Sequence, residues 1–125
     1  MDTTQYLYRN VIFSKKGKTI SLIDIDKPEI QGQELEPWFG VVLQLADGKH
    51  SVEDLFNFLS GQYSGNAPSN LKETVLSVVE RLAESKLIVL TEKPTELPYY
   101  LSAPYEFLDI EKAKNLLKKH RANVN

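Results

Sequence analysis

His50 and Ser51 are adjacent residues of types that could together do nucleophilic chemistry. A serine nucleophile needs a base within hydrogen-bond reach, and histidine commonly serves as that base. The spacing after Ser51 favours another role, because Asp54 follows three residues later and apolar residues then recur at helical spacing. The sequence therefore predicts that the Ser51 hydroxyl caps the start of a helix.

The other candidates for chemistry are also weak. His120 lies among basic residues, where a metal ion is poorly held. Asp24 and Asp26 are predicted to share one strand face about 6–7 Å apart, which suits paired carboxylates. No apolar pocket is predicted beside them to raise the pKa of either, so a solvated edge is the better interpretation. We predict no catalytic residues, no metal and no cofactor, and that the protein is not an enzyme.

The composition agrees with this prediction. A chain of 125 residues forms one domain, or one domain with a tail. The absence of cysteine excludes disulfides, thiol catalysis and thiolate metal sites. A net charge of −2 argues against a general binder of nucleic acid or membrane surfaces. No apolar run approaches the ~20 residues of a membrane span, and no signal peptide is evident, so we expect a cytoplasmic protein.

The charge is unevenly distributed along the chain. Residues 1–108 contain 10 Lys and Arg against 15 Asp and Glu, whereas residues 109–125 contain five against two. The body therefore has a net charge of −5 and the end one of +3. This difference suggests that the end is a separate piece.

Strand-forming residues dominate the beginning of the chain. Residues 6–13 and 19–25 are rich in β-branched and aromatic types, and the polar segment 14–18 between them predicts a hairpin connection. Residues 28–33 predict a short third strand. Pro28 at its start and Gly32 within it are typical of an edge strand.

The middle of the chain is predicted to be helical. Apolar residues recur at helical spacing in three segments, which begin near residues 37, 51 and 70. Gly48 is expected to end the first helix in a left-handed conformation. Asn70, with Glu73 three residues later, is expected to open the third helix, which ends near residue 85. Residues 86–91 then predict a short strand.

This order of elements predicts an α+β fold. We expect a winged-helix-like domain over residues 1–92, in which a small N-terminal antiparallel β-sheet packs on a three-helix bundle. Residues 93–125 are expected to form an extended arm rich in Pro and Tyr, followed by a basic helix over 109–121. The aromatic residues of the arm are expected either to pack back on the domain or to contact a partner.

The third helix has an unusually wide apolar surface. At 100° per residue its apolar side chains cover about 160°, whereas a helix that faces one core needs about 100°. The excess lies on the side of Leu76, Val79 and Ala83, with Lys72 at its edge. Either a second intramolecular partner such as the tail or an external ligand would cover this side.

Nucleic-acid binding through the third helix is disfavoured by its charge. Lys72 and Arg81 are its only basic residues, against the acidic Glu73, Glu80 and Glu84. A helix that contacts phosphates should be basic. We therefore expect no nucleic-acid partner.

Two segments resemble a known family. Residues 41–55, VVLQLADGKHSVEDL, are similar to the "L-x-x-L-D-G-x-x-T-x-E-E-L" stretch of PqqD-like domains, and residues 78–89, VVERLAESKLIV, are similar to their "L-x-x-L-x-x-x-G-L-[IL]" ending. The resemblance covers about residues 6–92 and departs at Ser85-Lys86, where the family has a glycine. The layout is most similar to the N-terminal recognition domain of ThiF-like azoline cyclodehydratase scaffold proteins, so the chain is either a stand-alone protein or part of a longer one.

The resemblance implies a non-catalytic recognition element for ribosomally synthesised precursor peptides. The leader region of such a peptide would bind by β-strand addition and be presented to a modifying enzyme such as a YcaO-type cyclodehydratase. The implied peptide-binding residues are an edge formed by Glu29, Ile30, Gln31, Gly32 and Gln33, and a groove wall formed by Lys72, Val75, Leu76 and Val79. The alternatives are a winged-helix interaction or dimerisation module, with a homodimer among its forms, and a DNA-binding regulator.

Overall fold

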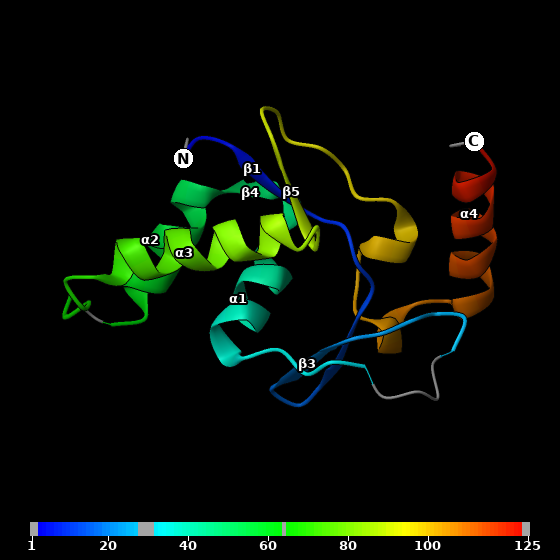
Figure 1. The fold of residues 1–125 in the computed structure, drawn as a ribbon, viewed down its shortest axis with the longest axis horizontal. Helices are drawn as coiled ribbons and strands as arrows, with labels where there is room; N and C mark the ends of the chain where they lie inside the picture. Colours follow the sequence, from blue (N-terminus) through cyan, green and yellow to red (C-terminus); the bar gives the residue numbers. More distant parts are fainter. Residues whose placement is uncertain (1–2, 28–31, 64, 124–125) are drawn as a thin grey trace. The chain divides into compact units, whose positions relative to one another are not determined.

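The structure is a computed structural model that describes residues 3–27, 32–63 and 65–123 (Figure 1). Within these residues the fold is α+β, with two small antiparallel sheets and four α-helices. The chain forms two compact units, one from residues up to 10 and 41–96, and one from residues 11–40 and 97 onward. The domain boundary expected near residue 92 stays a prediction, because compact units within one chain need not be domains.

The first unit contains a three-stranded antiparallel sheet in the order β4-β1-β5. Strand β1 (Tyr6–Arg9) lies in the middle, between β4 (Asp47–Ser51) and β5 (Ile88–Thr91) (Figure 1). Leu7 lies opposite Leu90, and the pairing of β1 with β4 is irregular between Tyr6 and Tyr8. The central strand is therefore paired with two segments that follow it by about forty and eighty residues.

Helices α2 (Val52–Gly61) and α3 (Leu71–Glu84) belong to the same unit, as do residues 41–45 of α1 (Pro37–Leu45). Helix α2 begins with the predicted capping box, since Ser51 Oγ accepts from Asp54 N and the Asp54 carboxylate accepts from Ser51 N. The apolar faces of these elements form the core of the unit. Its fully buried side chains include Leu7, Val42, Leu43, Val52, Leu55, Val75, Val79, Leu82 and Ile88.

The two ends of α3 differ from the expected cap and from the family pattern. Asn70 precedes the helix at the N-cap position, as predicted, but its side chain makes no capping hydrogen bond. At the other end Lys86 has a φ of 63°, and the amides of Lys86 and Leu87 donate to the carbonyls of Ala83 and Leu82. This is a Schellman motif in which Lys86 takes the left-handed position that glycine usually fills.

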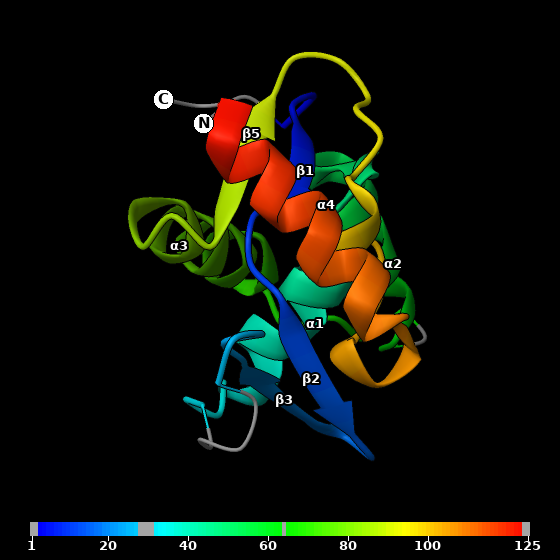
Figure 2. The ribbon, with the colours of Figure 1, turned by 90° about the vertical axis from the view of Figure 1, so that its right-hand side faces the viewer.

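The second unit contains a two-stranded hairpin. Strands β2 (Phe13–Lys16) and β3 (Thr19–Leu22) lie side by side and are antiparallel, with Phe13 opposite Leu22 (Figure 2). Gly17, with a φ of 62°, and Lys18 connect them. A two-residue connection needs a positive φ, and glycine adopts it without steric cost.

The predicted pairing of 6–13 with 19–25 is found only at the end of the first run, where Ile12 O accepts from Ile23 N and Phe13 lies opposite Leu22. The first run is interrupted after Arg9, and its halves β1 and β2 belong to different sheets. The connection is also shorter than the predicted segment 14–18, because Ser14, Lys15 and Lys16 are part of β2. Hydrophobic and β-branched content predicted strands at these positions, but it contains no information about their partners.

The predicted third strand at 28–33 is described only in part, since residues 28–31 lie outside the described residues. After them the chain runs antiparallel to β3. Leu22 N donates to Gln33 O at 2.9 Å, and Leu35 N donates to Ile20 O at 2.8 Å. A bridge between Ser21 and Glu34 lies between these two bonds. A third extended segment therefore pairs with β3, and this pairing is centred on Glu34.

The second unit ends with two short 3₁₀ turns, η1 (Tyr99–Leu101) and η2 (Tyr105–Phe107), and helix α4 (Ile110–Asn123). Tyr100 is buried, and its ring lies 6.3 Å from that of His120, whereas Phe107 is 75% exposed. One aromatic ring of the arm therefore packs within the unit and another faces solvent, and a contact of the arm with a partner stays a prediction.

Candidate functional site

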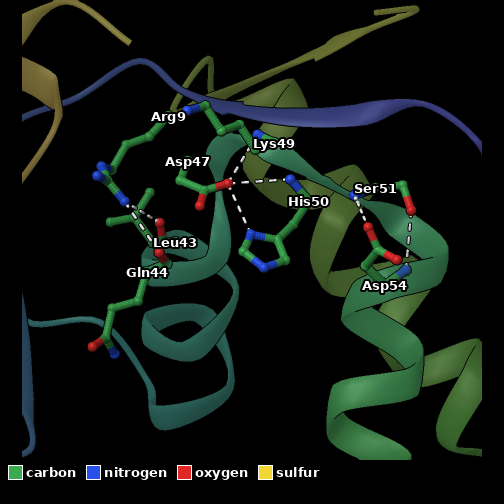
Figure 3. Close-up of polar contacts among 8 residues, drawn as sticks. All are labelled: Arg9, Leu43, Gln44, Asp47, Lys49, His50, Ser51 and Asp54. Carbon is green, nitrogen blue, oxygen red and sulfur yellow. Dashed lines mark hydrogen bonds and ion pairs between the residues drawn. The ribbon is translucent and has the colours of Figure 1, made fainter. Parts of the chain in front are cut away.

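The first polar cluster lies around Asp47 at the start of β4 (Figure 3). Asp47 Oδ1 accepts hydrogen bonds from Lys49 N at 2.9 Å, from His50 N at 3.1 Å and from His50 Nδ1 at 2.9 Å. Burial raises the pKa of Asp47, but these hydrogen bonds and the nearby His50 outweigh it, so that the pKa lies below its ordinary value. These three hydrogen bonds all stabilise the turn formed by residues 47–50.

This cluster lacks the geometry of a nucleophilic site. Although Ser51 is adjacent to His50, its hydroxyl oxygen accepts from Asp54 N at 3.0 Å as a helix cap, as the sequence predicts (Figure 3). The His50 ring instead hydrogen-bonds to Asp47 through Nδ1, within the same turn. The Asp47–His50 pair is therefore explained by local structure.

Arg9 is a buried charged residue that no pattern in the sequence indicated. Its side chain is buried, with 3% of its surface exposed, and Nη1 donates to the carbonyls of Leu43 at 2.9 Å and Gln44 at 3.3 Å (Figure 3). Burial lowers the pKa of Arg9 to about 10, an effect that the negative charge of Asp47 opposes. These carbonyls end α1, so the guanidinium satisfies acceptors that the helix leaves open.

The paired carboxylates of the sequence analysis are not on a strand. Strand β3 ends at Leu22, and Asp24 and Asp26 belong to the turn that follows it. Asp24 Oδ1 accepts from Asp26 N at 2.9 Å, and Asp26 Oδ2 lies 3.3 Å from Arg121 Nη1. Both carboxylates are exposed, and each has a structural partner. The expectation of a shared strand face is wrong, because short polar side chains favour turns over strands. Over the described ranges, no group of three or more His, Cys, Asp or Glu side chains could hold a metal ion.

A pocket of about 180 Å³ opens between α2 and α3. Its apolar part comes from Val52 and Phe56 on α2 and from Val75 and Leu76 on α3. Glu53 and Lys72 are exposed residues that contribute charges of opposite sign to its rim. The remaining lining residues are Thr3 and Asn57. This combination suits an apolar group with polar neighbours.

The structure brings together three of the predicted groove residues, namely Lys72, Val75 and Leu76. Val79 is not among the residues that line the pocket, and its side chain is completely buried. The wide apolar surface of α3 therefore serves two purposes: Val79 packs in the core, and Leu76 lines the pocket.

The predicted edge residues belong to the second unit. Glu29, Ile30 and Gln31 lie outside the described residues, while Gly32 and Gln33 run beside β3. Gly32 lies so close to the Leu22 carbonyl oxygen that a side chain at this position would collide with it.

The α2 side of the pocket was missed by sequence reasoning. Val52 and Phe56 are four residues apart and therefore lie on the same face of α2. This spacing was visible, but nothing in it indicated which residues of α3 would lie opposite.

Comparisons with protein-family models, with curated proteins and with solved structures found no match for this chain. Among the described helices, none has the length and apolar character needed to cross a membrane.

Proposed function

We propose that this chain is a winged-helix-like, PqqD-type recognition domain that binds the leader region of a ribosomally synthesised precursor peptide. In this proposal it performs no catalysis itself and presents the peptide, in the cytoplasm, to a modifying enzyme such as a YcaO-type cyclodehydratase. The observation that carries the proposal is the α2–α3 pocket, which contains Lys72, Val75 and Leu76.

The pocket suits one apolar side chain of an extended peptide. Val75 is 1% exposed and forms a floor, whereas the half-buried Leu76 and Phe56 form walls that a ligand can contact. Lys72 and Glu53 at the rim can pair with charged residues that flank the inserted side chain. A short peptide would therefore gain affinity from apolar burial and orientation from charge.

A separate feature of the second unit supports strand addition. Gln33 O and Leu35 N both bond to β3. Since backbone groups alternate in direction along a strand, the N–H and C=O of Glu34 between them point away from β3. An extended peptide can pair with such outward groups.

The proposal is tested by calorimetric titration with the leader segment of a precursor peptide encoded beside this protein. Leu76→Glu places a charge in the pocket, and Lys72→Glu reverses the charge of its rim. We expect each to weaken binding by about tenfold or more. Arg81→Glu makes the same charge change at an exposed α3 residue outside the pocket lining, and it should leave affinity within about twofold. Equal affinity in all four proteins would refute the pocket as the site.

A further inference from the structure

Strand β5 forms one edge of the β4-β1-β5 sheet. Its sequence, Ile-Val-Leu-Thr, contains neither charge nor proline. Charged residues and proline are the usual protection of an edge strand against pairing with another chain. The edge is therefore chemically suited to a further strand.

The hydrogen bonds of β5 show which of its backbone groups are directed outward. Asn10 N donates to Leu87 O at 2.9 Å, and the same register pairs Tyr8 with Val89 and Tyr6 with Thr91. Because the direction alternates along a strand, the N–H and C=O groups of Ile88 and Leu90 point away from β1. Two residues thus present four backbone groups at the open edge.

A shallow apolar groove follows this edge. It has a volume of about 370 Å³ and is lined by Asn10, Ala83, Lys86, Ile88, Val89 and Leu90. Val89 is one of the large apolar residues that are exposed, with 42% of its surface accessible. The groove lies wholly within the first unit.

The edge is complementary to itself. If a second copy pairs antiparallel with Val89 opposite its own Val89, then Ile88 lies opposite Leu90 and the outward groups of the two chains meet. The same register places Lys86 opposite Glu92 of the second copy, twice over. Both are exposed, and the long lysine side chain can reach across although the backbone turns at Lys86. Shape, hydrogen bonding and charge therefore favour one occupant.

We propose that the β5 edge is a homodimer interface, in which two copies of this chain pair along Ile88–Thr91 about a two-fold axis at Val89. The two sheets join into one of six strands. Each Lys86 forms an ion pair with Glu92 of the other copy, which selects this register. The surface is small, so the dimer is weak and forms and dissociates readily. This proposal is independent of the peptide pocket, which is lined by other residues.

The test is sedimentation velocity over a range of concentrations of the intact chain. Lys86→Glu and Glu92→Lys each place like charges opposite one another, and we expect either to weaken the dimer by about tenfold or more. The double charge swap Lys86→Glu with Glu92→Lys restores opposite charges and should restore dimerisation. This recovery distinguishes a pairing of the two residues from separate effects on folding.

Glu96→Lys is the matched control. It makes the same charge change as Glu92→Lys, but at the opposite edge of the sheet, where the N–H of the neighbouring Thr95 donates to Gly48 O of β4. It should therefore leave the dimer unchanged. A chain that stays monomeric at millimolar concentration would overturn the proposal. A dimer that Lys86→Glu and Glu92→Lys both leave intact would overturn it as well.

Amide hydrogen exchange locates the contact. We expect the amides of Ile88 and Leu90 to become more protected as the protein concentration rises, in step with dimer formation. If they are instead protected by an added leader peptide while the chain stays monomeric, the edge binds peptide and the homodimer proposal is wrong. The Leu76→Glu result is separate, because it tests the α2–α3 pocket.

Discussion

The two edges of the β4-β1-β5 sheet are held in different ways. At β4 the chain supplies its own polar contacts: Asp47 closes the turn of residues 47–50, and the Gly48 carbonyl accepts from Thr95 N at 2.9 Å. At β5 the strand is apolar, Val89 is exposed, and the sheet ends. One edge is therefore held by contacts within the chain, whereas the other ends the sheet without a further strand among the described residues.

This difference explains how a polar segment can be a strand. The sequence of β4, Asp-Gly-Lys-His-Ser, has little intrinsic preference for a strand. Its conformation is held by hydrogen bonds to neighbours and by the carboxylate of Asp47. Strand β5 has the opposite character, since Ile88 is buried in the core and its own composition favours a strand. Changes at β4 should therefore affect folding, and changes at the outer side of β5 should affect association.

The largest effect is expected for Arg9→Met. Loss of the guanidinium leaves the Leu43 and Gln44 carbonyls without this donor next to a buried side chain. We expect the free energy of unfolding to fall by about 2–4 kcal/mol, measured by urea denaturation. Arg81→Met, an exposed arginine on α3, should change it by less than about 0.5 kcal/mol. Similar losses in the two variants would show that the buried Arg9 contacts are not special.

Gly48→Ala should be the next most damaging change. Gly48 has a φ of 84° within β4, where a side chain is strained. We expect a loss of about 1–2 kcal/mol in the free energy of unfolding. Gly61→Ala is a suitable control, because nothing lies within 4 Å of the Cβ that it adds and its φ is not positive. A loss from Gly48→Ala no larger than that from Gly61→Ala would contradict the strain.

The Asp47 turn should make stability depend on pH. The pKa of Asp47 is lower in the folded chain than its ordinary value of 3.8, so folding favours the ionised carboxylate. Its stabilisation is present above pH 3.8 and is lost as the pH falls through the lower folded-state pKa. Asp47→Asn should therefore lose less stability than the parent chain between about pH 5 and about pH 2, as measured by thermal unfolding. Parallel curves for the two proteins would contradict this role.

The smallest effect on folding is expected at the open edge. Val89→Lys replaces an exposed side chain, so the stability of the monomer should change by less than about 0.5 kcal/mol. The same substitution places two lysines opposite one another at the proposed two-fold axis and should abolish the dimer in sedimentation experiments. A Val89→Lys variant that is well folded and still dimeric would show that the β5 edge is not the site of association.

Several parts of the fold could be predicted from local sequence. The three central helices follow from apolar spacing, and the capping box of Ser51 and Asp54 follows from two residues three positions apart. The hairpin turn was placed only approximately, and the left-handed residue Lys86 was not foreseen as a cap because lysine rarely takes that conformation. Local signals thus predicted where helices begin more reliably than how they end.

The sequence predicted the α3 side of the candidate pocket but not its α2 side. The wide apolar surface of α3 and the family resemblance together indicated a groove wall of Lys72, Val75, Leu76 and Val79, and the first three of these line a pocket. Periodicity could not show that Val79 is fully buried or that Phe56 faces the pocket from α2. Both depend on which helix packs against which, and a one-dimensional pattern does not contain that choice.

The amino-acid sequence by itself determined the α+β character, the helices and the lack of thiol chemistry, because these depend on residue types and short spacings. The tertiary structure alone decided that β1 pairs with β4 and β5, that Arg9 reaches the end of α1, and that β5 forms an open edge. Strand partners are chosen by contacts between residues up to about eighty positions apart. Such contacts depend on how the whole core packs, so no local pattern of residues can specify them.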